Sequence, residues 1–205
     1  MIAVGGMVMK FTTNHKIVLA SSSPRRKELL SKLGIPFEVV SSNVVETIIK
    51  EEKVENYVRE VALLKARDVA NNETGKTIIG ADTIVVYQNQ LLHKPKTTEE
   101  AISHLEKLSN NCHSVMTAIV IIDENGNEET FVEETKVYFR KLSPILINAY
   151  VNTGDPFDKA GGYGIQTGGA LFIERIEGDY NNVVGFPLAT VFEKLITLNI
   201  LHIQE

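Results

Sequence analysis

The run from Thr77 to Tyr87 constrains the fold of this chain more than any other segment, because it is apolar along both of its faces. Such a run belongs in a central strand that other elements cover on both sides. It is interrupted at Gly80-Ala81-Asp82, and an ionised carboxylate there is costly unless it is paired or metal-bound. A hydrogen bond at a strand kink is the structural alternative, but we expect Asp82 to serve a functional site.

Helices and strands are mixed along the rest of the chain, which favours an α/β fold in a single cooperative unit. Lys16 to Ala20 is a predicted strand, and the helix after it has Ser23 as N-cap, Pro24 as first residue and Gly34 as terminator. The other predicted helices are Val54–Ala70, Glu99–Leu108, Pro144–Tyr150 and Leu188–Leu198. The other predicted strands are Phe37–Val40, Ala170–Ile176 and a hairpin of Ser114–Ile122 with Glu128–Arg140.

Composition excludes several classes of protein. The 205 residues carry a net charge of -5, so the surface as a whole should repel nucleic acid, and a phosphate ligand needs a local cluster of basic groups. The lone Cys112 cannot form an internal disulfide, and the five histidines lack the spacing of a zinc site. Both facts fit a reduced, cytoplasmic location.

The N-terminal segment does not read as a targeting signal. Residues 1–10 are apolar, but they lack a basic region and are interrupted by Gly5-Gly6. We interpret residues 1–15 as an N-terminal extension of one domain that spans residues 1–205. No apolar run approaches the ~20 residues that cross a bilayer, so we expect no membrane insertion.

The segment from Ser21 to Arg26 is a candidate phosphate cradle. The hydroxyls of Ser21 and Ser23, the free N–H groups at the helix start and the guanidinium of Arg25 could all bind phosphate oxygens. Alternatively, Ser23 is only a helix cap and the arginines are only solvated charges. No Walker sequence occurs in the chain, which disfavours a kinase or ATPase of that type.

Further candidate site residues are spread along the chain. Glu46 is a second acid that could hold Mg²⁺ together with Asp82, although its role by itself is more often structural. Lys65 and Lys94 are each more often solvated lysines than ligands, and they gain weight only if they meet in one cleft. Gln166 follows the glycine-rich segment 161–164, and its amide suits the edge of a base.

Four segments in this order resemble the Maf family of nucleotide pyrophosphatases: Leu19–Arg26, Gly80–Val86, Lys94-Pro95 and Gly154–Gln166. The resemblance runs from about Ile17 to about Leu198. It implies a fold related to the inosine triphosphatase-like pyrophosphatases, with a long mixed central sheet and a nucleotide cleft between two lobes. The Ala-Asp-Thr and Asp-Lys-Ala-Gly-x-Tyr-Gly-Ile-Gln motifs look like the branch that acts on dTTP and UTP.

The resemblance also implies roles for single residues. Asp82 matches the proton acceptor of the family, and Arg25, Thr83 and Gln166 match positions tied to substrate choice. Lys65, Lys94 and Lys159 match positions at which the family has lysines that bind phosphate or line the site. Where relatives have consecutive acids, this chain has Val45-Glu46, so only Glu46 remains to help Asp82 hold a divalent cation, Mg²⁺ or Mn²⁺.

The sequence therefore predicts an enzyme that hydrolyses a pyrimidine nucleoside triphosphate to the monophosphate and pyrophosphate. Its expected partners are this substrate and a second copy of the chain in a homodimer. One competing function is a nucleotide-binding regulator of cell division that acts through a partner protein. Such a regulator needs the cradle but no catalytic acid, so Asp82 and the lysines argue against it. A phosphotransferase would need an acceptor site and would release no pyrophosphate.

Overall fold

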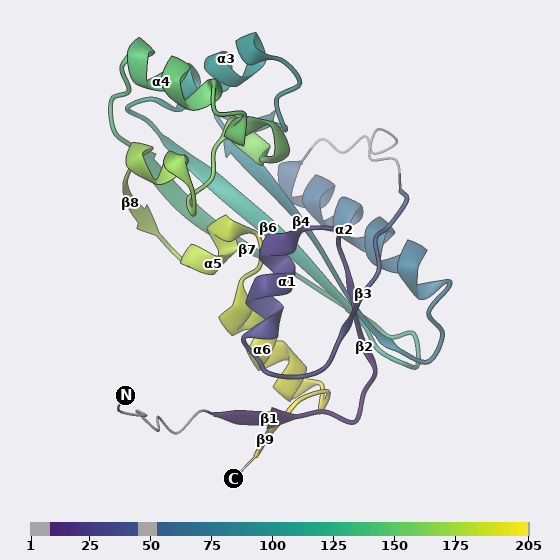
Figure 1. Ribbon diagram of the computed structural model, residues 1–205. Coiled ribbons are helices and arrows are strands. Elements are labelled where there is room, and N and C mark those ends of the chain that lie inside the picture. The colour runs from purple at the N-terminus through teal and green to yellow at the C-terminus, as the bar shows by residue number, and fades with distance from the viewer. Residues whose placement is uncertain (1–8, 45–52, 205) are drawn as a thin grey trace.

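A seven-stranded mixed sheet forms the centre of the computed structural model, which describes residues 9–44 and 53–204 (Figure 1). Its strand order is β3-β2-β4-β6-β7-β8, with β5 beside β4. Strand β2 runs parallel to β3 and β4, and the other neighbours are antiparallel. The strands are β2 Ile17–Ala20, β3 Glu38–Val39, β4 Thr77–Tyr87, β5 Gln90–Leu92, β6 Cys112–Ile122, β7 Glu128–Phe139 and β8 Ile173–Glu177. The predicted α/β class and mixed central sheet are confirmed.

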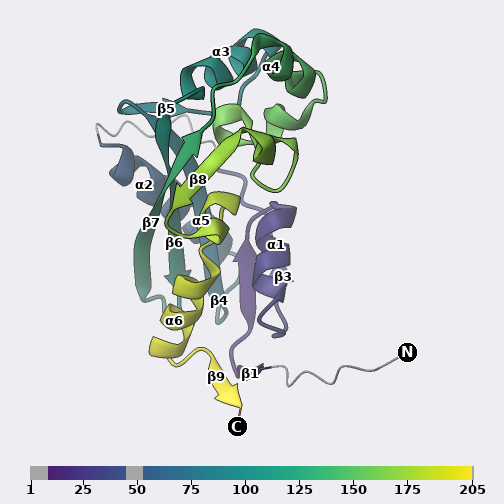
Figure 2. The ribbon, with the colours of Figure 1, turned by 90° about the vertical axis from the view of Figure 1, so that its left-hand side faces the viewer.

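Helices cover both faces of this sheet. Figures 1 and 2 show α2 on one face and α1 with α6 on the other. The helices are α1 Pro24–Ser31, α2 Val54–Ala70, α3 Thr98–Leu108, α4 Pro144–Val151, α5 Tyr180–Val184 and α6 Leu188–Thr197. Short 3₁₀ helices are η2 Asp155–Asp158, η3 Ala160–Gly162 and η4 Gly168–Phe172. Helices α3 and α4 lie together at one end of the long strands, away from α1 and α6.

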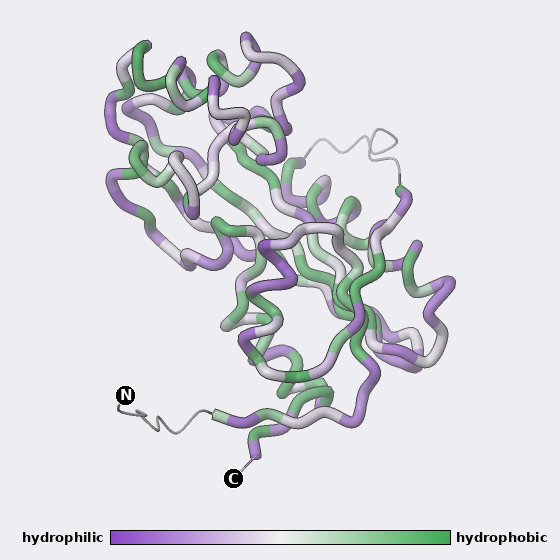
Figure 3. Tube along the Cα trace, viewed as in Figure 1, coloured by the Kyte–Doolittle hydropathy of each residue, from purple (hydrophilic) through white to green (hydrophobic). Residues whose placement is uncertain are grey.

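The alternation of side chains along β4 separates two hydrophobic cores. Ile78 packs with the apolar face of α2, whereas Ile79 packs with α1 and α6. A third core lies beneath α3 and α4 and includes Phe139 and Phe172. Figure 3 shows hydrophobic residues concentrated along the central strands, which agrees with the covered sheet expected from the apolar run.

Gly80 allows α2 to lie close to β4. A Cβ atom at this position would lie 2.7 Å from Cβ of Ala66 and 3.2 Å from the carbonyl oxygen of Ala62, so any larger residue would push the helix away. Within the same helix, Lys65 precedes Ala66 and is thereby brought to the strand beside Asp82. The interruption of the apolar run is thus a packing requirement that also serves the site.

Two strands at the ends of the described chain escaped prediction. β1 (Lys10–Thr12) pairs antiparallel with β9 (His202–Gln204), and the Thr13 hydroxyl donates to the carbonyl of Ile200 at 2.6 Å. Part of the segment interpreted as an extension is therefore attached to the C-terminal end of the chain, as Figure 2 shows.

The predicted strand Ala170–Ile176 is wrong at its start. It begins only at Ile173, because residues 168–172 form η4. Gly169 lies against the backbone of Gly164, where a Cβ atom would come within 2.7 Å, and Phe172 is fully buried. Tertiary packing thus holds these residues in a helical turn.

Across residues 9–44 and 53–204, none of the helices has the length and apolar character that crossing a bilayer requires.

Candidate active site

A break in strand pairing exposes the middle of β4. Pairing with β2 ends at Ala20 opposite Gly80, and pairing with β5 begins at Val85 opposite Leu92. Between these points the chain turns away from the sheet through residues 21–23 and enters α1. Asp82 and Thr83 lie in this gap, on opposite faces of the strand because side chains alternate.

The gap opens into a cavity of about 430 Å³, within the usual size range of small-molecule sites. Its lining brings together predicted site residues that are far apart in the sequence. They are Ser21, Ser23, Arg25, Lys65, Asp82, Thr83, Lys94, Lys159 and Gln166. Glu46, the second predicted metal ligand, lies outside the described residues. The condition that Lys65 and Lys94 share one cleft is met.

Asp82 and Lys65 form an ion pair at the α2 side of the gap. The Lys65 Nζ atom lies 2.7 Å from Asp82 Oδ1, and the two side chains are 18% and 12% exposed. The ammonium group gives the buried carboxylate an opposite charge, which offsets part of its desolvation cost. Asp82 is therefore an ion-paired carboxylate that also lines the cavity. Its contact is with a lysine of α2 and is not a hydrogen bond within a kinked strand.

The start of α1 is built as the sequence predicts. Ser23 caps the helix, with its hydroxyl accepting from the Arg26 N–H at 3.5 Å, and Pro24 begins the helix. Ser21 is buried, and its hydroxyl accepts from the Ser23 N–H at 3.2 Å. The helix N-terminus and both serines line the cavity, so this end of α1 offers positive potential to an anion.

Arg26 organises the site, and the sequence interpretation missed this role. Its guanidinium donates to the carbonyl oxygens of Ala81 and Gly185 at 2.9 Å each, to the Thr83 hydroxyl at 2.9 Å and to the Ser21 hydroxyl at 3.2 Å. These bonds tie α1 to β4 and to the end of α5. The sequence does contain a signal: residue 26 lies three and four positions before two buried leucines of α1, so it shares the buried face of the helix.

Thr83 belongs to a chain of hydrogen bonds that begins at the partly exposed Arg26 and ends at buried residues. Its hydroxyl lies 3.0 Å from that of Thr117, which donates to the carbonyl of Asn182 at 3.1 Å. The next two residues of α5, Val183 and Val184, line the cavity. Thr83 therefore holds one wall of the cavity in place through α5.

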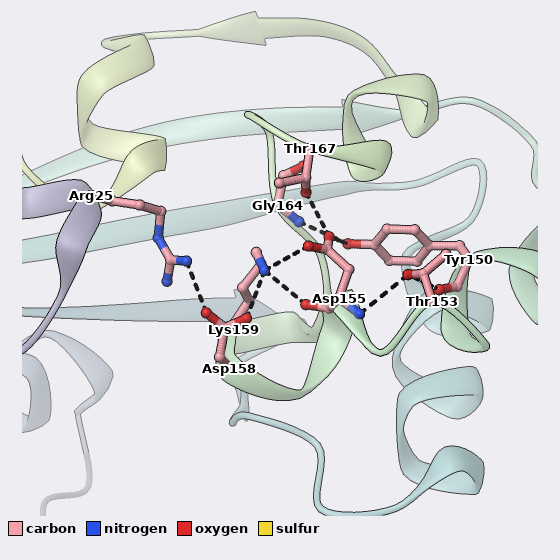
Figure 4. Close-up of polar contacts among 8 residues, drawn as sticks. All are labelled: Arg25, Tyr150, Thr153, Asp155, Asp158, Lys159, Gly164 and Thr167. Atoms are coloured by element: carbon pink, nitrogen blue, oxygen red, sulfur yellow. Dashed lines mark hydrogen bonds and ion pairs between the residues drawn. The ribbon is translucent and has the colours of Figure 1, made fainter. Parts of the chain in front are cut away.

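Two cations that line the cavity, Arg25 of α1 and Lys159 near the glycine-rich loop, are paired with carboxylates (Figure 4). Arg25 Nη1 donates to Asp158 Oδ2 at 2.9 Å. The Lys159 ammonium donates to Asp158 Oδ1 at 2.6 Å and to the carboxylate and carbonyl oxygens of Asp155 at 2.9 and 2.8 Å. Burial raises the pKa of Asp158, but hydrogen bonds from Lys159 and Arg25 outweigh it and lower the pKa overall. Asp158 is thus ionised at neutral pH.

The glycine-rich loop before Gln166 is fixed by close packing. Gly161 has φ +70, and a Cβ atom there would meet the Val85 side chain at 2.9 Å. Tyr163 is buried, and its hydroxyl lies 2.7 Å from His113 Nε2. Burial lowers the pKa of His113 to about 3, so this histidine is neutral at physiological pH. The loop that carries Gln166 is therefore held in place by close packing of the residues just before it.

The donor set can be tested for a divalent metal ion. Among the residues that the structure describes, no three His, Cys, Asp or Glu side chains cluster as a metal cage would require. Mg²⁺, however, commonly binds proteins through one or two carboxylates and completes its shell with substrate phosphates and water. The Asp82 carboxylate, facing a cavity of small-molecule size, fits this mode of binding.

The family model and the similar proteins of known name agree on one family. A family model described as Maf-like protein matches residues 16–198. A dTTP/UTP pyrophosphatase from Geobacillus sp. (strain WCH70) is 49% identical over 174 residues, which cover 85% of this chain and 93% of that protein. A dTTP/UTP pyrophosphatase from Bacillus cereus (strain AH820) is 45% identical over 186 residues, which cover 91% of this chain and 97% of the relative.

Solved structures are similar at the level of the fold. A HAM1 protein from Coxiella burnetii has a TM-score of 0.50 and 16% identity, with 90% of this chain and 99% of that chain covered. At this identity the similarity concerns the architecture and not the chemistry. It agrees with the fold that the sequence motifs imply.

Proposed function

Because this chain belongs to the Maf family, we propose that it hydrolyses dTTP and UTP to the nucleoside monophosphate and pyrophosphate. The observation that carries the proposal is one cavity that combines a helix N-terminus, a paired carboxylate and a rigid loop bearing an amide side chain. The names of the relatives from Geobacillus and Bacillus cereus support the choice of pyrimidine nucleotides.

In this proposal the triphosphate lies against the N-terminus of α1. Ser21, Ser23 and Arg25 contact its oxygens, because N–H and O–H donors at a helix start favour negative charge. Lys94, which also lines the cavity, neutralises charge that develops on the leaving pyrophosphate. Lys159 is already bound by two aspartates, so its main effect is to hold the loop, and its stem packs beneath Gly164.

Asp82 is the proposed general base. A water molecule held against its carboxylate loses a proton to it and attacks the α-phosphorus, after which the bond to the β-phosphate oxygen breaks and pyrophosphate leaves. Lys65 keeps Asp82 in place during this step through their 2.7 Å contact. A divalent cation held by Asp82, with Glu46 as a second candidate ligand, would supply charge neutralisation to the phosphates.

Arg25→Ala should raise KM and lower kcat together, reducing kcat/KM for dTTP by about 10- to 100-fold. A charge-assisted bond to phosphate of about 1.5–3 kcal/mol acts in both the ground and transition states. Steady-state kinetics with dTTP measure this effect. Lys27→Ala removes a charge from the same helix at a position outside the cavity lining and is the matched control. Parental kinetics in Arg25→Ala would return Arg25 to the role of a solvated charge.

Gln166→Ala should reduce the preference for dTTP and UTP over GTP by about tenfold or more. One amide can form two hydrogen bonds with the carbonyl and N–H of a pyrimidine, and a site built for such bonds discriminates against bases that leave its groups unpaired. The ratio of kcat/KM values for UTP and GTP is the measurement. Gln90→Ala, on the exposed part of β5, is the control. If Gln166→Ala keeps the full preference for pyrimidine nucleotides, Gln166 does not recognise the base.

Incubating the purified chain with a panel of nucleotides and Mg²⁺ or Mn²⁺ tests the proposed function. We expect pyrophosphate release from dTTP and UTP, and nucleotide binding without turnover would instead favour the regulator of cell division. A homodimer and a cytoplasmic location stay predictions of the sequence. Light scattering of the purified chain and cell fractionation can check them.

A further inference from the structure

Asp158 joins the two sides of the cavity by its contact with Arg25. Arg25 belongs to the first turn of α1, whereas Asp158 ends η2 in the segment that leads to the glycine-rich loop (Figure 4). The Nη1 to Oδ2 distance is 2.9 Å, and the side chains are 29% and 63% exposed. A carboxylate thus occupies the guanidinium that the proposed function assigns to substrate phosphate.

Asp155, the neighbouring acid, is held in a different way. Its carboxylate accepts hydrogen bonds from Tyr150, from Thr167 at 2.6 Å and from Lys159 at 2.9 Å. Its side chain is 21% exposed, against 63% for Asp158. Because Asp155 is fixed by several donors from three parts of the chain, it serves the loop, and Asp158 is the acid that can move at low cost.

Lys159 makes a movement of Asp158 away from Arg25 inexpensive. Its ammonium donates to Asp158 Oδ1 at 2.6 Å, while Arg25 contacts the other oxygen, Oδ2. If phosphate replaced the carboxylate at Arg25, Asp158 would keep an opposite charge beside it. An exposed ion pair contributes little to stability, whereas a phosphate can bind the guanidinium through two bonds.

We propose that Asp158 determines the affinity of the site for phosphate by competing with the substrate for Arg25. Substrate binding exchanges the carboxylate for phosphate oxygens, so the apparent affinity is reduced by the fraction of molecules in which Arg25 is engaged. The same exchange weakens binding of the product pyrophosphate and favours its release. The identity of the anion rests on the proposed function, but the competition at Arg25 does not.

Titration calorimetry of the full chain with inorganic pyrophosphate, without added metal, tests this competition. Asp158→Asn should bind pyrophosphate about three- to fivefold more tightly than the parent, since the stronger exposed ion pairs shift an equilibrium by factors of this size. Glu38→Gln is the matched control. Glu38 is an exposed acid paired with Lys76 at 2.8 Å and lies outside the cavity lining, so its removal changes the net charge equally. Its affinity should stay within about twofold of the parent.

The Arg25→Ala background shows whether the effect passes through Arg25. There, Asp158→Asn should give little further gain, because the shared partner is missing. Unchanged or weaker binding in Asp158→Asn, a full gain without Arg25, or no measurable pyrophosphate binding by either protein would each overturn the proposal. Since pyrophosphate binding needs no turnover, an inactive chain that shows the gain would overturn the proposed function alone.

Discussion

Asp82→Asn should lower kcat for dTTP by about 10² to 10⁴-fold while substrate binding is largely retained. The substitution keeps the size of the side chain and an oxygen that can accept from Lys65, but it removes the basicity that proton transfer requires. Turnover measured across a Mg²⁺ titration distinguishes two roles of the carboxylate. Loss of a base is insensitive to added metal, whereas a weakened metal site recovers in part at high concentration by mass action.

The fold should survive this substitution, and a thermal melt beside the kinetics checks it. Glu134→Gln neutralises an exposed acid of β7 that lies outside the cavity lining and provides the control. Near-parental turnover in folded Asp82→Asn would remove Asp82 from the chemistry. The position of the carboxylate in a covered strand would then need a purely structural explanation.

Arg26→Ala should reduce both stability and activity. The guanidinium donates to the carbonyls of Ala81 and Gly185 and to the hydroxyls of Thr83 and Ser21, and unpaired buried acceptors cost about 1–3 kcal/mol each. We expect the free energy of unfolding to fall by about 2–5 kcal/mol, which lowers Tm by roughly 5–15 °C in a domain of this size. kcat/KM for dTTP should fall at least tenfold, since β4 and α1 lose their connection at the gap.

Arg25→Ala is the natural comparison for this variant. It removes the same charge from the adjacent position of the same helix, but Arg25 makes an exposed contact with Asp158, so Tm should change by only about a degree or two. Chemical denaturation and thermal melts of the two variants separate the roles. Equal melting of the two proteins would contradict the organising role of Arg26.

Local patterns in the sequence predict most of the sheet and its helices. The bounds of α2 and β4 agree with the prediction at both ends, because a helical repeat and a long apolar run are encoded within the segments themselves. β1 and β9 escape such reasoning, since each consists of three residues and their pairing joins opposite ends of the chain. The late start of β8 escapes it for a similar reason, because contacts between Gly169 and Gly164 override the local preference.

The candidate site divides in the same way. Family motifs and matched positions name nine of the residues that the cavity brings together, but they assign no role to Arg26. The hydrogen bonds of Arg26 and the contact of Arg25 with Asp158 depend on segments that meet only in the folded chain. Asp158 stands beside the lysine that the motif emphasises, and sequence alone gives no indication of its partner across the cavity.

Hydrolysis of dTTP in water enriched in ¹⁸O, with mass spectrometry of both products, tests the central claim most directly. Attack of water at the α-phosphorus predicts dTMP that carries one ¹⁸O atom and pyrophosphate that carries none. Formation of dTDP and inorganic phosphate, or label in the pyrophosphate, would contradict the proposed reaction.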